Sequence, residues 1–335
     1  MEFGEVPVDA AGGAILAHSE MLPGGRLRKG QVLGAGEIAA LRDAGYARVT
    51  VARLGPGDVA EDAAATRLAK ALHVEGSGLV ASAAFTGRVN LNATGPGIVA
   101  LDAAAVHRLN LTDPAITLAT LAPFQRVAAG TLVGTVKIIT YGVGEGALGQ
   151  ACAVAAAVGL RVLPVTRKSA GLVLTDVAGQ EAKLNLKGRR AVETRLRALG
   201  ITLAAVETVA HDEAAIAAAL SRLPGELLLI LTGSATSDPM DTAPAALRRA
   251  GGRVMRFGMP VDPGNLLFLG DLGDRPVIGL PGCARSPALN GADWVLERLA
   301  CGLAVTDADI AGMGVGGLLK EIPQRPQLRE PAAKP

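Results

Sequence analysis

Aromatic residues are scarce in this chain of 335 residues, since Phe, Trp and Tyr together make up 2% and Trp294 is the single tryptophan. Ala, Leu, Val and Gly must therefore fill most of the core. Proteins that hold single-stranded nucleic acid commonly stack its bases on aromatic side chains within a basic groove. The basic residues here are not interleaved with aromatics, which argues against nucleic acid as a partner.

Cysteine is also rare, with three residues at Cys152, Cys283 and Cys301. They are odd in number and have no CxxC spacing, which argues against a disulfide framework and against a structural zinc site. The four histidines are scattered without the spacing of zinc ligands. A reducing cytoplasm fits this cysteine usage.

Neither a strong charge nor a long apolar run is present. The formal net charge of +2 creates no strong field for polyanions. The longest apolar stretch, residues 151–165, is interrupted by Arg161 and Pro164 and is too short for a membrane span. Acidic residues near the amino terminus stand where a signal peptide would be basic. The sequence predicts a cytoplasmic protein without a targeting segment or a membrane partner.

The first half of the chain has a mixed texture. Residues 1–54 alternate short strand-like runs with a helix around residues 38–42, which predicts an amino-terminal α+β segment. Residues 55–165 continue with predicted helices at 58–72 and 102–109 between short β-like runs. We predict a middle α+β module there, whose role the sequence does not disclose.

From residue 168 onward, strands and helices alternate. This alternation predicts an α/β fold over residues 168–303, a doubly wound, mostly parallel sheet with helices on both faces. Residues 227–231 read Leu-Leu-Leu-Ile-Leu, an uncharged run that suits a strand buried on both faces. We place this domain at residues 166–305, and we expect residues 306–335, rich in Gly and Pro, to form a tail or linker.

Three loops of this domain each follow a strand-like run, at residues 232–241, 261–265 and 279–286. Their small residues allow a ligand to approach the backbone, and free amide groups at a helix start bind phosphate oxygens. Open α/β sheets bind ligands just beyond the carboxyl ends of their strands. The sequence therefore predicts a pocket for an anionic ligand, formed by these loops.

Two carboxylates in the first loop suggest a cation. Asp238 and Asp241 are three residues apart, so on the first turn of a helix they share a face and could hold Mg²⁺ together with substrate phosphates. The alternative is capping, since aspartate is favoured at helix starts and Pro239 suits the first helical position. Both interpretations remain open at the level of the sequence.

A basic run opens the helix expected at residues 190–199. Lys183, Lys187, Arg189 and Arg190 could meet a phosphate group. A basic cluster on a helix is more often a solvated face, which is the interpretation that the sequence favours.

The three loops, in this order, resemble those of the molybdopterin-binding domain of molybdenum-cofactor biosynthesis proteins. That family typically carries a Ser-Gly-Gly-Val-Ser-type loop with an acidic tail, a Pro-Gly-Lys-Pro segment and a Gly-Leu-Pro-Gly-Asn-Pro loop. The matching positions are 232–241, 263–266 and 279–284. The whole chain resembles the molybdopterin-binding half of bacterial proteins in which this module is fused to a cofactor nucleotidyltransferase.

Three positions depart from the family pattern. Asn265 replaces the lysine of the second loop, Cys283 replaces the asparagine of the third loop, and Ser234 replaces the second glycine of the first loop. The lost lysine removes a charge that could pair with phosphate. We expect the loss of this charge to affect catalysis more than binding.

The resemblance implies a protein that binds molybdopterin, free or adenylylated, for molybdate insertion or nucleotide transfer, with Mg²⁺ and molybdate as further ligands. If it is an enzyme, it is similar to a molybdopterin molybdotransferase, with Asp241 and Asp238 as catalytic residues and metal ligands. The remaining cofactor-binding candidates are Thr175, Asp176, Thr232, Gly233, Ser234, Ala235, Thr236, Ser237, Pro263, Gly264, Asn265, Pro281, Gly282, Cys283, Arg285 and Ser286.

Two other functions remain open. The chain could be a non-catalytic holder that delivers the cofactor to a nucleotidyltransferase or to maturation proteins of molybdoenzymes, an alternative that Asn265 favours. It could also be a nucleotide pyrophosphatase similar to the competence-damage family, which shares the fold. By analogy with the family, we expect a homo-oligomer.

Overall fold

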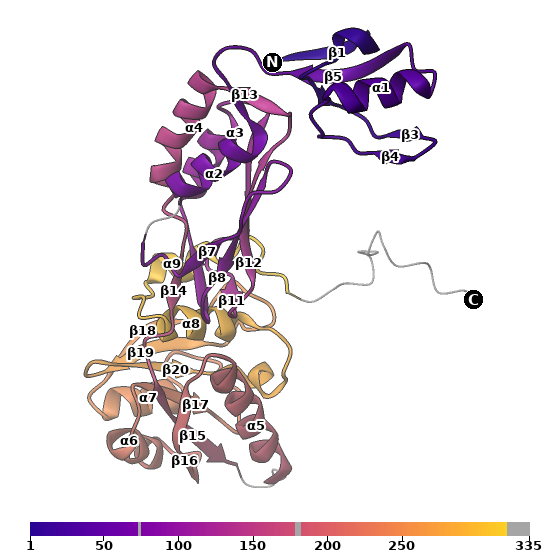
Figure 1. Cartoon of the computed structure of the whole chain (residues 1–335). Helices are drawn as coiled ribbons and strands as arrows, with labels where there is room; N and C mark the ends of the chain where they lie inside the picture. The colour runs from indigo at the N-terminus through magenta and orange to yellow at the C-terminus, as the bar shows by residue number, and fades with distance from the viewer. Residues whose placement is uncertain (73–74, 178–181, 320–335) are drawn as a thin grey trace. The chain divides into compact units, whose positions relative to one another are not determined.

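The computed structural model describes residues 1–72, 75–177 and 182–319. The chain divides into two compact units, one ending at Leu163 and the other beginning at Pro164. Figure 1 labels most of the elements of both units.

The first part of the amino-terminal unit is built on a small antiparallel sheet of order β1-β5-β2. Its elements are β1 (Glu2–Pro7), β2 (Ile15–Leu16), the hairpin β3 (Glu20–Leu22) and β4 (Gly25–Leu27), α1 (Ala35–Asp43) and β5 (Arg48–Arg53). Leu16, Leu41 and Val51 are among the buried residues of its core. The helix and the last strand agree with the sequence pattern, whereas β1 was not predicted, because exposed charged residues punctuate it.

The rest of this unit has a separate core that includes Leu68, Leu91 and Leu109. Its helices are α2 (Glu61–Leu72), α3 (Ala103–Asn110) and α4 (Glu145–Val158). Its strands are β6 (Asp58–Ala60), β7 (Leu79–Ala81), β8 (Arg88–Ala93), β9 (Gly97–Ala100), β10 (Ile116–Thr120), β11 (Arg126–Val127), β12 (Leu132–Ile138), β13 (Gly142–Gly144) and β14 (Arg161–Pro164). The strands pair in the orders β10-β12-β8-β7, β11-β9-β14 and β13-β6.

The longest apolar stretch of the sequence is divided between two of these elements. Gly159, with φ of 58°, ends α4, and the chain turns into β14. Within the described ranges, no helix combines the length and the apolar character that a membrane crossing requires.

The carboxy-terminal unit alternates strands and helices. Its strands are β15 (Ser169–Asp176), β16 (Thr202–Ala210), β17 (Leu227–Leu231), β18 (Arg253–Phe257), β19 (Phe268–Leu272) and β20 (Arg275–Gly279). Its helices are α5 (Ala182–Ala198), α6 (Glu213–Arg222), α7 (Thr242–Arg249), the 3-10 turn η2 (Gly282–Arg285), α8 (Gly291–Ala300) and α9 (Asp307–Gly312).

The six strands form one sheet of order β16-β15-β17-β20-β19-β18. The first four run parallel, and β19 is antiparallel to both of its neighbours. The α/β fold predicted for residues 168–303 is therefore confirmed. All five residues of β17 are buried, as a central strand covered on both faces requires.

Helices cover both faces of this sheet. Ile216 of α6 and Leu247 of α7 share one core with Val173, Ile230 and Val277 of the strands. Across the sheet, α5 packs on β15 and β16, and α8 packs on β20. Successive strand residues point to opposite faces, so the central strand β17, with helices on both sides, is apolar throughout.

The tail or linker expected over residues 306–335 begins with ordered structure. Thr306 caps α9 through its side chain, which accepts a hydrogen bond from the amide of Asp309. Further on, the amide of Asp262 donates to the carbonyl of Gly317, and the amide of Leu319 donates to the carbonyl of Asp262. The remainder of the expected tail lies outside the described residues.

A candidate ligand site at the carboxyl edge of the sheet

The sheet topology brings the three predicted loops to one edge. Strands β15, β17 and β20 are parallel, so the segments that follow them leave from the same side. Phe257 pairs with Phe268, and Phe268 pairs with Gly279, so the loop between β18 and β19 also lies at this edge. Residues 232–241, 261–265 and 279–286 thus share one rim of the carboxy-terminal unit.

The first loop is attached to the end of β15 by Thr175. This side chain is fully buried, and its hydroxyl oxygen accepts a hydrogen bond from the amide of Gly233 at 2.7 Å. The same hydroxyl lies 3.0 Å from Nδ1 of His211, which follows the end of β16. The ends of β15, β16 and β17 are therefore connected through one threonine.

Arg285 connects the first and third loops. Its Nη2 atom donates a hydrogen bond to the carbonyl of Thr232, directly after β17. The amide of Leu280 donates to the carbonyl of Ile230 at 2.8 Å, which aligns the chain leaving β20 with the end of β17. These contacts hold the two loops side by side.

The second loop is fixed by close backbone packing. The carbonyl of Pro263 accepts a hydrogen bond from the amide of Gly291 at 2.8 Å. At Gly264, with φ of 143°, a Cβ atom would lie 2.7 Å from the amide nitrogen of Gly291, so a side chain does not fit. Asn265, next in sequence, is exposed at the rim.

The third loop is held from within by Arg195 of α5. Its guanidinium group donates to the carbonyls of Ala284 at 2.8 Å, Ser286 at 2.8 Å and Ala288 at 3.0 Å. Nε also donates to a carboxylate oxygen of Asp293 at 2.6 Å, and this ion pair is buried. One arginine thus sets the course of the chain between β20 and α8.

Asp241 is the N-cap of α7. One of its carboxylate oxygens accepts from the amide of Thr242 at 2.7 Å, and the other accepts from the amide of Ser237 at 3.0 Å. The hydrogen bond from Ser237, together with that from Thr242 and the nearby His211, lowers the pKa of Asp241 below its usual value. The capping interpretation of Asp241 is therefore present in the structure, and it keeps the group ionised.

Asp238 is exposed, and its carboxylate accepts from the amide of Met240 at 2.7 Å. Across the described ranges, no group of three or more His, Cys, Asp or Glu side chains is arranged to hold a metal ion. A cation at Asp238 and Asp241 would therefore need further ligands from phosphate oxygens or water.

The predicted cofactor-binding residues differ in accessibility. The exposed ones, which can touch a ligand through their side chains or backbone, are Asp176, Ser234, Ala235, Ser237, Asn265 and Gly282. Pro263, Cys283 and Ser286 are half-buried. The buried ones, which shape the loops from beneath, are Thr175, Thr232, Gly233, Thr236, Gly264, Pro281 and Arg285.

Sequence reasoning did not single out four residues that organise this edge. Arg195 and Asp293 pin the third loop, His211 meets Thr175, and Asn185 of α5 donates to the carboxylate of Asp176. A signal existed for Arg195, because it occupies an inward position of its helix between the buried residues Val192 and Leu199. His211 could have been found from its place directly after a strand.

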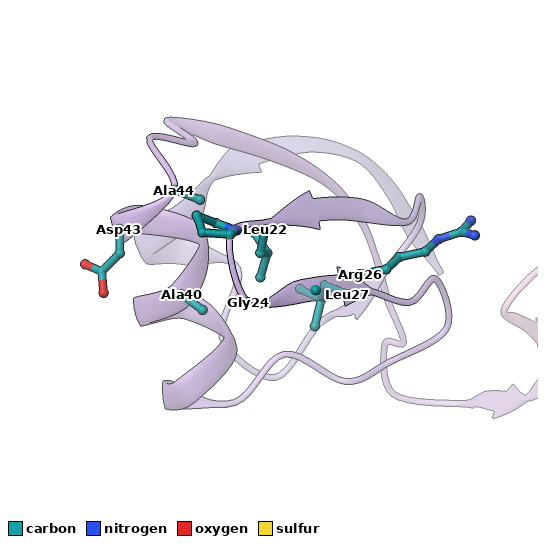
Figure 2. A pocket seen from close by; sticks show the side chains of 9 residues that line it. Leu22, Gly24, Arg26, Leu27, Ala40, Asp43 and Ala44 are labelled. Atoms are coloured by element: carbon teal, nitrogen blue, oxygen red, sulfur yellow. The ribbon is translucent and has the colours of Figure 1, made fainter.

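A cavity of about 450 Å³ lies in the amino-terminal unit between α1 and the β3–β4 hairpin. Leu22, Leu27 and Ala40 contribute to its lining. Figure 2 shows its two charged residues, Arg26 and Asp43, pointing away from it in opposite directions. This cavity offers an ionic ligand no inward charge, in contrast to the sheet edge.

Comparison with known families identifies a domain within the carboxy-terminal unit. Residues 187–300 match a family model described as a probable molybdopterin binding domain. A second model, described as a domain of unknown function, matches residues 5–53. No curated protein matches the sequence significantly.

Solved structures of molybdenum-cofactor biosynthesis proteins resemble the chain at low identity. The moeA protein from Pyrococcus horikosii is 15% identical, with a TM-score of 0.31, over 90% of this chain and 76% of that one. MoaB from Thermus thermophilus is 20% identical, with a TM-score of 0.27, over 40% and 97%. A molybdenum cofactor biosynthesis protein from Pyrococcus furiosus is 11% identical, with a TM-score of 0.22, over 93% and 65%. At these scores the structures add no argument to the family match.

Proposed function

We propose that the carboxy-terminal unit, whose residues 187–300 match a family model described as a probable molybdopterin binding domain, binds molybdopterin, free or adenylylated, in molybdenum-cofactor biosynthesis. The observation that carries this proposal is the shared rim of the three loops. The ends of β15, β17 and β20 meet there, and hydrogen bonds from Gly233 to Thr175 and from Arg285 to Thr232 join them.

The rim suits a phosphorylated ligand in shape. Ser234, Ala235 and Ser237 are small and exposed, so a flat ring with a phosphate can approach the backbone closely. The loops are anchored from beneath by buried residues such as Thr175, which leaves the exposed atoms pre-positioned. Molybdopterin, a pterin with a dithiolene and a terminal phosphate, has both features.

Within this proposal we favour the role of cofactor holder over that of molybdotransferase. Asn265 stands, exposed at the rim, where the family pattern has a lysine, so a phosphate there meets no charge from this position. A holder would present the cofactor to a nucleotidyltransferase or to a molybdoenzyme maturation protein, as a homo-oligomer in the cytoplasm.

The proposal includes Mg²⁺ bound at Asp238 and Asp241. A carboxylate oxygen that accepts one amide hydrogen bond keeps a second lone pair, so both residues retain capacity for a cation. The lowered pKa of Asp241 keeps it anionic and fit for that role. When bound, the ion would neutralise charge on the ligand phosphates.

The test is a binding titration of the purified chain with molybdopterin and with its adenylylated form, followed by Trp294 fluorescence under anaerobic conditions. AMP release in the presence of molybdate and Mg²⁺ is measured separately. We expect micromolar or tighter binding without AMP release. Rapid AMP release would instead select the molybdotransferase role, and hydrolysis of ADP-ribose would select the pyrophosphatase. Absence of micromolar binding of either form overturns the proposal.

The cation is tested with matched variants. Asp241→Asn keeps a capping oxygen but removes the charge, and we expect it to weaken binding in Mg²⁺ about tenfold. We expect removal of Mg²⁺ from the wild type to weaken binding by a similar factor. Asp274→Asn is the control, because Asp274 is an exposed aspartate in the β19–β20 turn, at the opposite edge of the sheet. Affinity that does not respond to Mg²⁺ shows the cation assignment to be wrong.

A further inference from the structure

A cavity of about 350 Å³ lies between α5 and the third loop, beside the rim. Its lining consists of Lys183, Leu186, Lys187, Arg190, Ala191, Thr194, Arg285 and Pro287. Four of these side chains are cationic and none is acidic. A concave surface with charge of one sign concentrates ligands of the opposite sign.

Arg285 is the innermost of the four cations. It is 9% exposed, and this burial lowers the pKa of its guanidinium group. Nη2 donates to the carbonyl of Thr232, whereas Nε has no hydrogen-bond partner among the described residues. A buried cation with an unsatisfied donor is costly, and an anion in the cavity would offset that cost.

The other three cations lie on one face of α5. Lys183, Lys187 and Arg190 follow at intervals of four and three residues, the spacing that aligns side chains along a helix. None of them forms an ion pair with a described residue. Arg189, which does not line the cavity, pairs with Glu193 at 2.7 Å. No carboxylate of the described residues therefore neutralises the three cations of α5 that face the cavity.

Gly188 brings this face close to the third loop. A Cβ atom at Gly188 would lie 2.7 Å from Cδ2 of Leu231 and 3.4 Å from Cγ of Arg285. Glycine inside a helix costs about 1 kcal/mol relative to alanine. Here it lets the helix pack against the end of β17, with Arg285 passing beside it towards the lysines.

A solvated face, which the basic run of the sequence favours, does not account for Arg285. Exposed lysines are hydrated wherever they stand, but a buried guanidinium group has lost that hydration. Its position also adds to the mutual repulsion of the four cations. A bound anion with several acceptor oxygens would replace the lost hydration of Arg285 and would reduce the repulsion among the four cations.

We propose that this cavity binds a phosphate or diphosphate group of a small-molecule ligand, with Arg285 at its base and Lys183, Lys187 and Arg190 along its wall. The assignment of that group to molybdopterin or its adenylylated form rests on the proposed function. The cavity would then supply the positive charge that Asn265 does not.

The test compares two double variants that each remove two charges from α5. Lys187→Gln/Arg190→Gln changes the cavity wall, whereas Arg189→Gln/Arg197→Gln changes exposed residues outside the cavity. Binding of inorganic pyrophosphate is measured by calorimetry at an ionic strength of about 0.15 M, where the Debye length is about 8 Å, and Trp294 fluorescence verifies that each variant is folded. Each removed side chain would donate a charge-assisted hydrogen bond to the anion, so we expect the first variant to bind at least about tenfold more weakly. The second should stay within about twofold of the wild type, since exposed charges act weakly at a distance.

Equal weakening in the two variants, or no pyrophosphate binding by the wild type at millimolar concentration, overturns the inference. Molybdopterin is then titrated into the same proteins. If the wild type binds molybdopterin and the cavity variant binds it equally well, the inference fails while the proposed function stands. If pyrophosphate binding depends on Lys187 and Arg190 but molybdopterin does not bind, the anion site is supported and the proposed function is not.

Discussion

Arg195 is the residue on which the course of the third loop most depends. It is buried, it donates to carbonyls of the loop, and it forms an ion pair with Asp293. Removing one partner of a buried ion pair leaves the other charge desolvated and uncompensated. The carbonyls of Ala284, Ser286 and Ala288 would lose their donor at the same time.

We therefore expect Arg195→Met, which keeps most of the volume, to lower the free energy of unfolding by about 3–5 kcal/mol. The matched control is Arg189→Met on the same helix, whose exposed pair with Glu193 contributes about 0.5 kcal/mol or less. Urea unfolding measures both variants. Similar stabilities for the two would show that the buried pair does not hold the loop.

At the scale of elements, the sequence predicted what local patterns encode. The strand β17 is wholly apolar, and Asp102 caps α3 by accepting from the amides of Ala104 and Ala105. The elements that the sequence pattern missed or shortened carry polar residues whose roles depend on other parts of the fold. In β1, Glu2 and Glu5 are exposed and only Gly4 and Val6 are half-buried. In the first two turns of α5, Lys183 and Lys187 line a cavity.

The same limit applies to the candidate site. Parallel strands place their carboxyl ends together, so the common rim of the three loops follows from the predicted topology. The contacts across the rim do not, because Thr175 meets His211 and Arg285 meets Thr232 only once the chain is folded. For Asp241 the sequence left two roles open, an N-cap and a cation ligand. The structure contains the N-cap.

The cap of α7 also predicts a pH dependence. The pKa of Asp241 is lowered in the folded state, so its contribution to stability is present above the pKa of the unfolded chain, about 3.9, and is lost as the pH falls through the folded value. Between pH 6 and pH 3 the wild type should lose more stability than Asp241→Asn, which cannot titrate. Urea unfolding at several pH values measures this difference. Parallel pH curves for the two proteins would contradict the assignment.

At the scale of the whole molecule, the described cores are separate. One includes Leu91 and lies within residues 64–162, and another includes Phe268 and lies within residues 173–277. The single tryptophan, Trp294, belongs to α8 of the carboxy-terminal unit. Its fluorescence therefore reports on that unit, whereas circular dichroism reports on the whole chain.

This separation predicts different effects for two buried leucines. Leu91→Ala should destabilise the amino-terminal unit by about 2–5 kcal/mol and leave the Trp294 unfolding midpoint unchanged. Leu229→Ala, in the fully buried β17, should shift that midpoint. The measurement is urea unfolding followed by fluorescence and by circular dichroism on the same samples. A shift of the Trp294 midpoint in Leu91→Ala would show that the two units unfold as one.

The pair of hydrogen bonds between Asp262 and the segment that reaches Leu319 has a mechanical consequence. Asp262 belongs to the second loop, so tension applied to the chain at Leu319 acts first on one wall of the rim. In the same loop, the backbone at Gly264 packs closely against Gly291 at the start of α8, so the loop has little room to move relative to this helix. A displacement of the segment at residues 317–319 would therefore move the second loop with it.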